Sequence, residues 1–337
     1  MTIETQRSIP FVYKLIMGML LCAGMFMTSL LLGAADISAK DVWLALTSTT
    51  AAGGPISIIR EIRLPREIGA FFVGAALAVA GAVMQGMTRN PLADPGLLGL
   101  TAGANAALAL TIALLPSANY ILITIACFIG AAIGTVLVFG IGSLKKGGFS
   151  PFRIVLAGAA ISAFLYAIAQ GIGIYFKISK DVSMWTAGGL VGTSWSQLQV
   201  IVPFILVGLL LSALLSRQLT ILSLSEEVAV GLGQRTARVK AILFLVVILL
   251  AGASVALVGN MVFIGLVVPH IVRAFVGTDY RYIIPMSAVV GAIFMLFADT
   301  VGRTIHSPYE TSVTAIVAII GLPFFLFIVQ KGGKGFS

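Results

Sequence analysis

Residues 11–33 read FVYKLIMGMLLCAGMFMTSLLLG, in which Lys14 is the only charged residue. An α-helix rises about 1.5 Å per residue and the hydrocarbon core of a bilayer is about 30 Å thick, so a span needs roughly 20 mostly apolar residues. Comparable blocks recur to residue 330. Hydrophobic residues make up 59% of the chain and charged residues 10%, whereas soluble domains carry about 25% charged residues. The sequence therefore indicates an integral membrane protein rather than a large soluble helical one.

The apolar blocks predict ten spans, and each must be helical because lipid offers no partner for backbone N–H and C=O groups. The blocks do not alternate as the strands of a barrel would. We expect an all-α integral membrane fold in a single polytopic membrane domain, 1–337, with about ten spans from 11 to 330. Small residues at four-residue spacing along 70–86 predict a face on which another helix packs closely. The predicted spans are 11–33, 67–87, 96–115, 120–141, 152–176, 198–216, 239–259, 261–276, 283–301 and 311–330.

Lys and Arg set the orientation, because cytoplasmic loops carry an excess of them. With the N-terminus inside, fourteen of the 21 Lys and Arg residues lie on the cytoplasmic side, and both termini are cytoplasmic. Residues 217–240 and the loop 88–99 then lie inside, while 34–66 and 179–197 are extracytoplasmic. Topology and lipid headgroups account for the whole basic excess, so we expect no nucleic acid partner.

The sequence offers no catalytic motif. His270 and His306 are far apart and belong to no HExxH pattern, and there is no GxxxxGK[ST] loop that would bind ATP. Cys22 and Cys127 fall in apolar spans and are interpreted as small hydrophobic residues. We therefore expect a protein that is not an enzyme, with no cofactor or metal of its own. An ion-coupled transporter would keep titratable residues near the midplane, and none is predicted there.

The cytoplasmic segment 217–240 contains the spacing of a helix start. Ser223 and Glu226 match the S-x-x-E pattern of a capping box, which predicts a short helix over 224–230 ended by the following glycines. Such a helix could be a lever that another protein grips, or the segment could be a solvated loop with incidental helix.

Basic residues at the outer mouth of the second span run against the usual charge bias. Arg60, Arg63 and Arg66 recur every three residues, and Arg303 lies at the outer end of the ninth span. Two interpretations remain open: the arginines cap acidic neighbours, or they receive acidic groups of a partner. The acidic neighbours are Glu61, Glu67 and Asp299.

Three motifs follow one another in this chain: RLPR (63–66), GAALAVAGAVMQGMTRNPLADPGLLGLTAGA (74–104) and FIGLVVPHIVR (263–273), followed by Asp299 with Arg303. Together they resemble the permease family of iron-siderophore and cobalamin ABC importers. The similarity runs from the first span to the C-terminus. It implies the type II importer permease fold in the cell membrane of a bacterium.

The resemblance also implies partners and cargo. A second permease subunit, identical or paralogous, two cytoplasmic ATPase subunits that bind ATP and Mg²⁺, and an extracytoplasmic binding protein would complete the importer. The expected cargo is a ferric siderophore, with haem or cobalamin as the alternative. An ion-coupled secondary transporter and an intramembrane enzyme are the competing classes.

Site residues follow from the resemblance in the same way. Arg63, Arg66 and Arg303 would receive glutamates of the binding protein through charge-assisted hydrogen bonds. The helices 152–176 and 311–330 would flank the translocation path. The contact with the ATPase would be centred on Glu226, Glu227, Gly231, Leu232 and Gly233.

Overall fold

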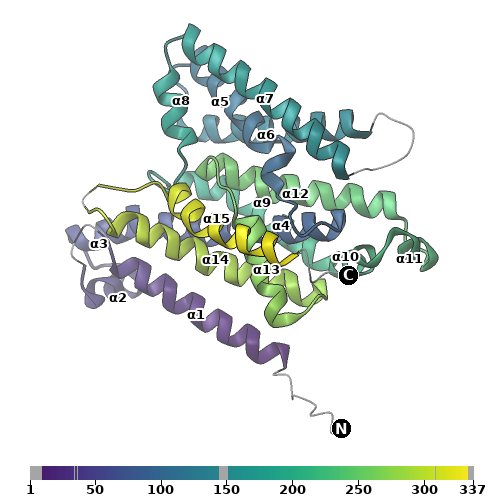
Figure 1. The fold of residues 1–337 in the computed structure, drawn as a ribbon. Helices are drawn as coiled ribbons and strands as arrows, with labels where there is room; N and C mark the ends of the chain where they lie inside the picture. The colour runs from purple at the N-terminus through teal and green to yellow at the C-terminus, as the bar shows by residue number, and fades with distance from the viewer. Residues whose placement is uncertain (1–9, 34, 36, 144–150, 308, 333–337) are drawn as a thin grey trace.

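The computed structural model describes residues 10–33, 35, 37–143, 151–307 and 309–332, and all regular secondary structure in these ranges is helical (Figure 1). Seven helical stretches are long and apolar enough to cross a membrane. Their main helices are α1 (Phe11–Leu31), α4 (Leu64–Thr88), α6 (Tyr120–Ser143), α7 (Pro151–Tyr175), α9 (Trp195–Leu214), α12 (Thr236–Val258) and α14 (Tyr280–Thr304). Three shorter apolar helices are α5 (Leu100–Leu114), α13 (Ile264–Val276) and α15 (Val313–Gly332).

The all-helical membrane fold predicted from the sequence is confirmed, and each of the ten predicted ranges overlaps one of these helices. Helices α4 and α12 lie at the centre of the bundle and are mostly buried, whereas α1 and α7 lie toward opposite edges and expose most of their apolar side chains (Figure 1). Such exposed apolar faces are suited to lipid or to another membrane subunit.

The small-residue face of α4 packs closely on α14, as predicted. A Cβ built on Gly74 would lie 2.3 Å from the carbonyl oxygen of Gly291, so any larger side chain at position 74 would force the two helices apart. In a membrane, small residues allow the backbone approach and the dense packing that hold helices together.

Helices α5 and α13 are short because both begin inside the bundle. A Cβ on Gly81 would lie 1.8 Å from the carbonyl oxygen of Gly265, which places the start of α13 against the inner half of α4. A Cβ on Gly103 would lie 2.1 Å from the carbonyl oxygen of Gly130, so the first turn of α5 meets the middle of α6. The chain between α4 and α5 must therefore return into the bundle.

This return corrects the predicted inner loop at 88–99. Asp94 lines a small cavity together with Leu77 and Ala251, which lie midway along α4 and α12. The Asp94 carboxylate accepts a hydrogen bond from the Gly96 N–H at 2.7 Å and begins a 3₁₀ turn, η2 (Pro95–Leu98). The Asp94 side chain thereby satisfies one backbone donor of this turn.

The two predicted extracytoplasmic segments lie at the same end of the bundle. The first forms α2 (Ala39–Thr47), α3 (Gly54–Ile58) and a π-helical turn, η1 (Ile59–Arg63), that continues into α4; its residues 34 and 36 lie outside the described residues. The second contains α8 (Ser179–Thr186). The Trp195 indole N–H donates to the Arg60 carbonyl at 3.0 Å, which joins the two segments.

Two short helices, α10 (Ser216–Leu224) and α11 (Glu226–Gly231), occupy the opposite end of the bundle. The beginning of α1 and the end of α15 lie toward that same end (Figure 1).

Candidate functional site

Arg66 lies in the first turn of α4, where it binds two carboxylates from distant parts of the chain. Its Nη2 is 2.9 Å from Asp299 Oδ1, and its Nη1 is 2.7 Å from Glu310 Oε1. Arg66 is 7% exposed and Asp299 is fully buried, whereas the Glu310 side chain is 39% exposed. Glu310 is therefore the member of this group that solvent can reach.

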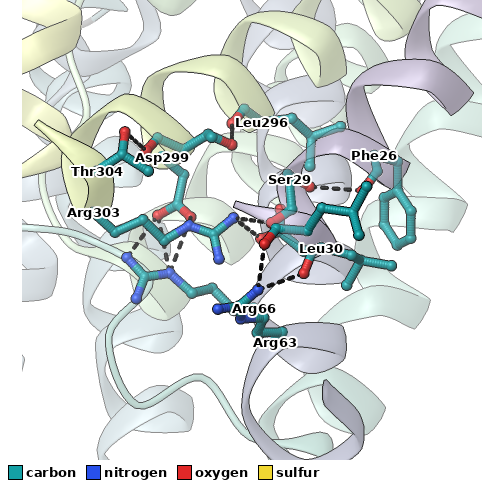
Figure 2. Close-up of polar contacts among 12 residues, drawn as sticks. Phe26, Ser29, Leu30, Arg63, Arg66, Leu296, Asp299, Arg303 and Thr304 are labelled. Atoms are coloured by element: carbon teal, nitrogen blue, oxygen red, sulfur yellow. Dashed lines mark hydrogen bonds and ion pairs between the residues drawn. The ribbon is translucent and has the colours of Figure 1, made fainter. Parts of the chain in front are cut away.

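Arg303 approaches Asp299 from the other side (Figure 2). Its Nε is 3.4 Å from Asp299 Oδ2, one helical turn away, and its Nη2 forms an ion pair with the fully buried Glu67. The same Nη2 donates to the carbonyl of Ser29 at 2.7 Å. Arg303 thus joins α14 to both α4 and α1.

Arg63 makes no ion pair among the described residues and instead binds backbone carbonyls at the end of α1. It donates to Leu30 O at 2.6 Å, Leu31 O at 3.0 Å and Ala35 O at 2.7 Å. The last carbonyls of a helix lack intrahelical partners and carry partial negative charge. Arg63 and Arg303 together therefore cap the outer end of α1.

These contacts resolve part of the ambiguity that the sequence left open. The structure brings Arg66 and Arg303 to acids of the same chain, with Glu67 and Asp299 as predicted neighbours, while Glu61 is exposed and makes no such contact among the described residues. The sequence reasoning missed Glu310, since it is separated from Arg66 by 244 residues and belongs to no recognisable motif. We name the six side chains Arg63, Arg66, Glu67, Asp299, Arg303 and Glu310 the outer arginine cluster.

The outer arginine cluster balances three positive and three negative formal charges in a largely buried place. Buried ion pairs contribute little net stability when intact, but removal of one partner leaves an uncompensated charge and costs about 3–5 kcal/mol. The cluster thus fixes the relative positions of α1, α4 and α14. The cluster borders solvent at Glu310, so an external group could approach it there.

At the other end of the bundle, α11 begins at a different serine from the one predicted. The Ser225 hydroxyl accepts from Val228 N at 3.0 Å and caps the helix, whereas Ser223 lies inside α10 and donates to Thr220 O. The short helix and its glycine ending are present as expected. Gly233 has φ +77°, a left-handed conformation that suits glycine and closes the helix.

An ion pair holds α11 against the start of α12. Lys240 Nζ is 2.7 Å from Glu226 Oε1, and Lys240 is buried. This bond holds the pKa of the Glu226 carboxyl below its ordinary value, with nearby basic residues adding to the effect. Glu227, Gly231 and the two residues after it point outward and are exposed. Glu226 therefore positions the helix, while its neighbours are free to contact another protein.

The exposed side of α11 is apolar to an unusual degree for a segment outside the spans. Val228 is 44% exposed, Val230 58% and Leu232 66%, and Leu224 at the end of α10 is 68% exposed. Contiguous exposed apolar residues rimmed by charge are typical of protein interaction surfaces. We name these four residues the α11 apolar patch.

No three His, Cys, Asp or Glu residues come close enough to hold a metal ion within the described ranges. Two cavities open beside α7. One of 590 Å³ lies between α5, α7 and α8, and one of 380 Å³ lies between α7, α15 and the start of α13. Tyr166 lines both, and we name them the α7 cavities.

Comparison with known proteins gives concordant matches over nearly the whole chain. The FecCD transport family matches residues 20–331. The iron(3+)-hydroxamate import system permease protein FhuB of Bacillus subtilis (strain 168) is 43% identical over 98% of this chain and 86% of its own length. The Fe(3+)-citrate import system permease protein YfmD of the same organism is 41% identical over 90% of each chain. A solved metal-chelate type ABC transporter in an inward-facing conformation is 27% identical, with a TM-score of 0.82, over 95% of this chain and 99% of its own.

Proposed function

The chain belongs to the FecCD transport family, and we propose that it is the permease subunit of an ABC importer that carries ferric siderophores across the cell membrane of a bacterium. The observation that carries this proposal is the full-length match to permeases of iron-chelate import systems. The α7 cavities support it, since their volumes fall within the roughly 300–1,000 Å³ typical of small-molecule sites. The family is one of transport proteins, not of enzymes.

The finer topology is part of the proposal. Seven long and three shorter apolar helices would together make ten spans, with α5 and α13 entering from within the bundle. Both termini would be cytoplasmic, because the beginning of α1 and the end of α15 lie at the end of the bundle that carries α11 and most of the described Lys and Arg residues.

The α11 apolar patch would be the surface that receives the motion of the ATPase subunits. Leu232 and Val230 are exposed apolar side chains of the kind that fill a cleft on a partner. At Glu227 and the flanking glycines, a partner could approach the helix closely. The ion pair of Glu226 with Lys240 then transmits the displacement of α11 to α12 at the bundle centre. ATP and Mg²⁺ would bind to the partner subunits.

The outer arginine cluster would be the docking surface for the binding protein. Arg66 donates from both of its Nη atoms to the carboxylate of Glu310, which solvent can reach. A glutamate of the binding protein would take the place of Glu310 on Arg66. Arg63 and Arg303 would add positive electrostatic potential next to Arg66 and hold the outer end of α4 in position.

A direct test is uptake of ⁵⁵Fe-labelled ferric siderophore by cells with and without this gene, with a plasmid copy restoring it. We expect the deletion strain to lose uptake and the copy to restore it, with dependence on ATP rather than on the proton gradient. Uptake abolished by a protonophore while cellular ATP is maintained would instead support an ion-coupled transporter. Unchanged iron uptake together with loss of haem or cobalamin uptake would reassign the cargo.

A further inference from the structure

The α7 cavities follow one another along α7, the larger toward the outer end and the smaller toward the middle of the bundle. The larger cavity is lined by Gly173 and Ile174, in the last turn of α7, and by Ser183 of α8, which lies at the outer end (Figure 1). The smaller cavity is lined by Asp94 of the returning segment and by Val262, which precedes α13. A solute that moved inward along α7 would therefore meet the larger cavity first.

Tyr166 stands at the boundary between the two cavities. Among the described residues, it is the one that lines both. On the neighbouring helix α5, Asn105 lines the larger cavity and Thr101 lines the smaller, and these positions are one helical turn apart, about 6 Å along the axis. The wall between the cavities is therefore about as thick as one side chain, and Tyr166 supplies that side chain from α7.

The surroundings of Tyr166 hold its ring without enclosing it. Its hydroxyl forms a hydrogen bond with the side chain of Asn105, and Asn105 Oδ1 accepts from the Thr186 hydroxyl of α8 at 3.3 Å. A helical side chain leans over the residues three and four positions before it, which here are the small residues Ala163 and Ser162. Tyr166 is half-buried, so its ring can change rotamer without a change in the backbone of α7. Asn105 links this ring to a helix at the outer end.

We propose that the Tyr166 ring is a gate on the translocation path, which separates the two α7 cavities when the importer is at rest and swings aside when a chelate passes. The proposal rests on the proposed function, since it takes the α7 cavities as parts of that path. Tyr166 lies outside the motifs 63–66, 74–104 and 263–273, so the resemblance that they carry assigns it no role. A neutral ring closes the passage by its bulk, whatever the charge of the chelate.

The experiment measures whether a reagent added outside reaches the smaller cavity. Cys22 and Cys127 are buried and are replaced by alanine, and one reporter cysteine is then introduced on either side of the ring. Ser183→Cys reports on the larger cavity and Val262→Cys on the smaller, and both changes nearly conserve side-chain size. The complete ATPase–permease assembly is expressed in spheroplasts of a strain that lacks the binding protein, so that the membrane-impermeant reagent MTSET meets only the outer face. The rate of modification is read on the purified permease.

Three substitutions separate the ring from other causes of exposure. Tyr166→Ala removes the ring, whereas Tyr166→Phe keeps it and loses only the hydroxyl. Tyr175→Ala is the matched control, because it is the same substitution on the same helix at a tyrosine that is 82% exposed and lines neither of the α7 cavities.

With Tyr166 in place, and in Tyr175→Ala, we expect Val262→Cys to react slowly. Tyr166→Ala should speed its modification at least about tenfold, because an open state populated to about 10% or less becomes permanent. Tyr166→Phe should speed it only about threefold, the effect of one weak hydrogen bond. Ser183→Cys should react at the same rate in all variants. Loaded binding protein should raise the rate of Val262→Cys where Tyr166 is present and leave it unchanged in Tyr166→Ala.

Equal rates of Val262→Cys modification with Tyr166 in place and in Tyr166→Ala would overturn the gate, as would a rate in Tyr166→Phe equal to that in Tyr166→Ala. A rate that loaded binding protein does not change would also overturn it, since the ring would then be a fixed wall. ATP-dependent uptake of ⁵⁵Fe-labelled ferric siderophore by cells with the unmodified chain is measured in parallel. Its absence would count against the proposed function itself, while the reporter rates still decide whether Tyr166 separates the two cavities.

Discussion

Replacement of Asp299 by Asn tests whether the outer arginine cluster holds the subunit together. Asp299 is fully buried, accepts from Arg66 at 2.9–3.1 Å and lies 3.4 Å from Arg303. The change removes one of three balancing negative charges and leaves a net positive charge in a place that water does not reach. Because the loss of one partner from a buried pair costs about 3–5 kcal/mol, we expect the free energy of unfolding to fall by about that amount.

The measurement is unfolding of the purified subunit by SDS in mixed micelles, followed by circular dichroism. Asp279→Asn is the matched control: it is the same substitution next to the same helix, at an acid whose partner Arg281 is exposed. An exposed pair contributes about 1 kcal/mol or less, and asparagine can keep the cap of α14. Equal losses in the two variants would refute the reasoning.

A double variant separates lost charge balance from lost packing. Asp299→Asn combined with Arg66→Gln removes the uncompensated charge, so it should be more stable than the sum of the two single changes predicts. If the two losses simply add, Asp299 and Arg66 are not energetically coupled and the charge balance of the cluster has no stabilising role.

Four further predictions concern the other parts of the molecule. Glu310→Gln should tighten binding of the binding protein several-fold in a surface-plasmon assay, because it frees the docking arginine, and weaker binding would argue against competition. Leu232→Ser should reduce co-purification of the ATPase subunits by about tenfold while the permease still elutes as one species. Gly81→Val should prevent assembly of the bundle, seen as aggregation on size exclusion, since the added carbons clash with backbone. Because the pKa of Glu226 is lowered, its bond to Lys240 stabilises α11 above about pH 4.5, and this stabilisation is lost as the pH falls through the pKa of the folded protein. Amide hydrogen exchange in α11, corrected for the intrinsic rate, should therefore rise on acidification. This pH-dependent rise should be absent in Glu226→Gln.

Hydrophobicity alone predicted where the helices are but not how deep two of them begin. The blocks at 96–115 and 261–276 were expected to be ordinary spans. Their first turns lie inside the bundle because Gly265 meets Gly81 and Gly103 meets Gly130. Such contacts join residues far apart in the chain, and no local pattern specifies which glycine will meet which.

The same limit applies to the candidate site: a contact within one helix could be predicted from the sequence, whereas a contact between distant segments could not. The Asp299–Arg303 pair lies one helical turn apart, so its spacing was readable from the sequence. The pairing of Arg66 with Glu310 joins opposite ends of the chain and was not. The cap of α11 shows that local patterns can also mislead. Ser223 has the spacing of a capping box, but α10 extends through it, so the next serine, Ser225, caps α11 instead.

The attachment of α1 has a consequence for the order in which the protein is made. Helix α1 buries little of its surface, and its outer end is fixed by donors from Arg63 and Arg303. Ribosomes deliver residue 303 long after α1 has entered the bilayer, and domains form from the N-terminus onward during synthesis. The contact of α1 with Arg303 therefore forms late. In nascent chains that end before α14, Arg63 is the one of these two donors that can hold α1, so α1 should be held more loosely there and be more accessible to the insertion machinery or a protease.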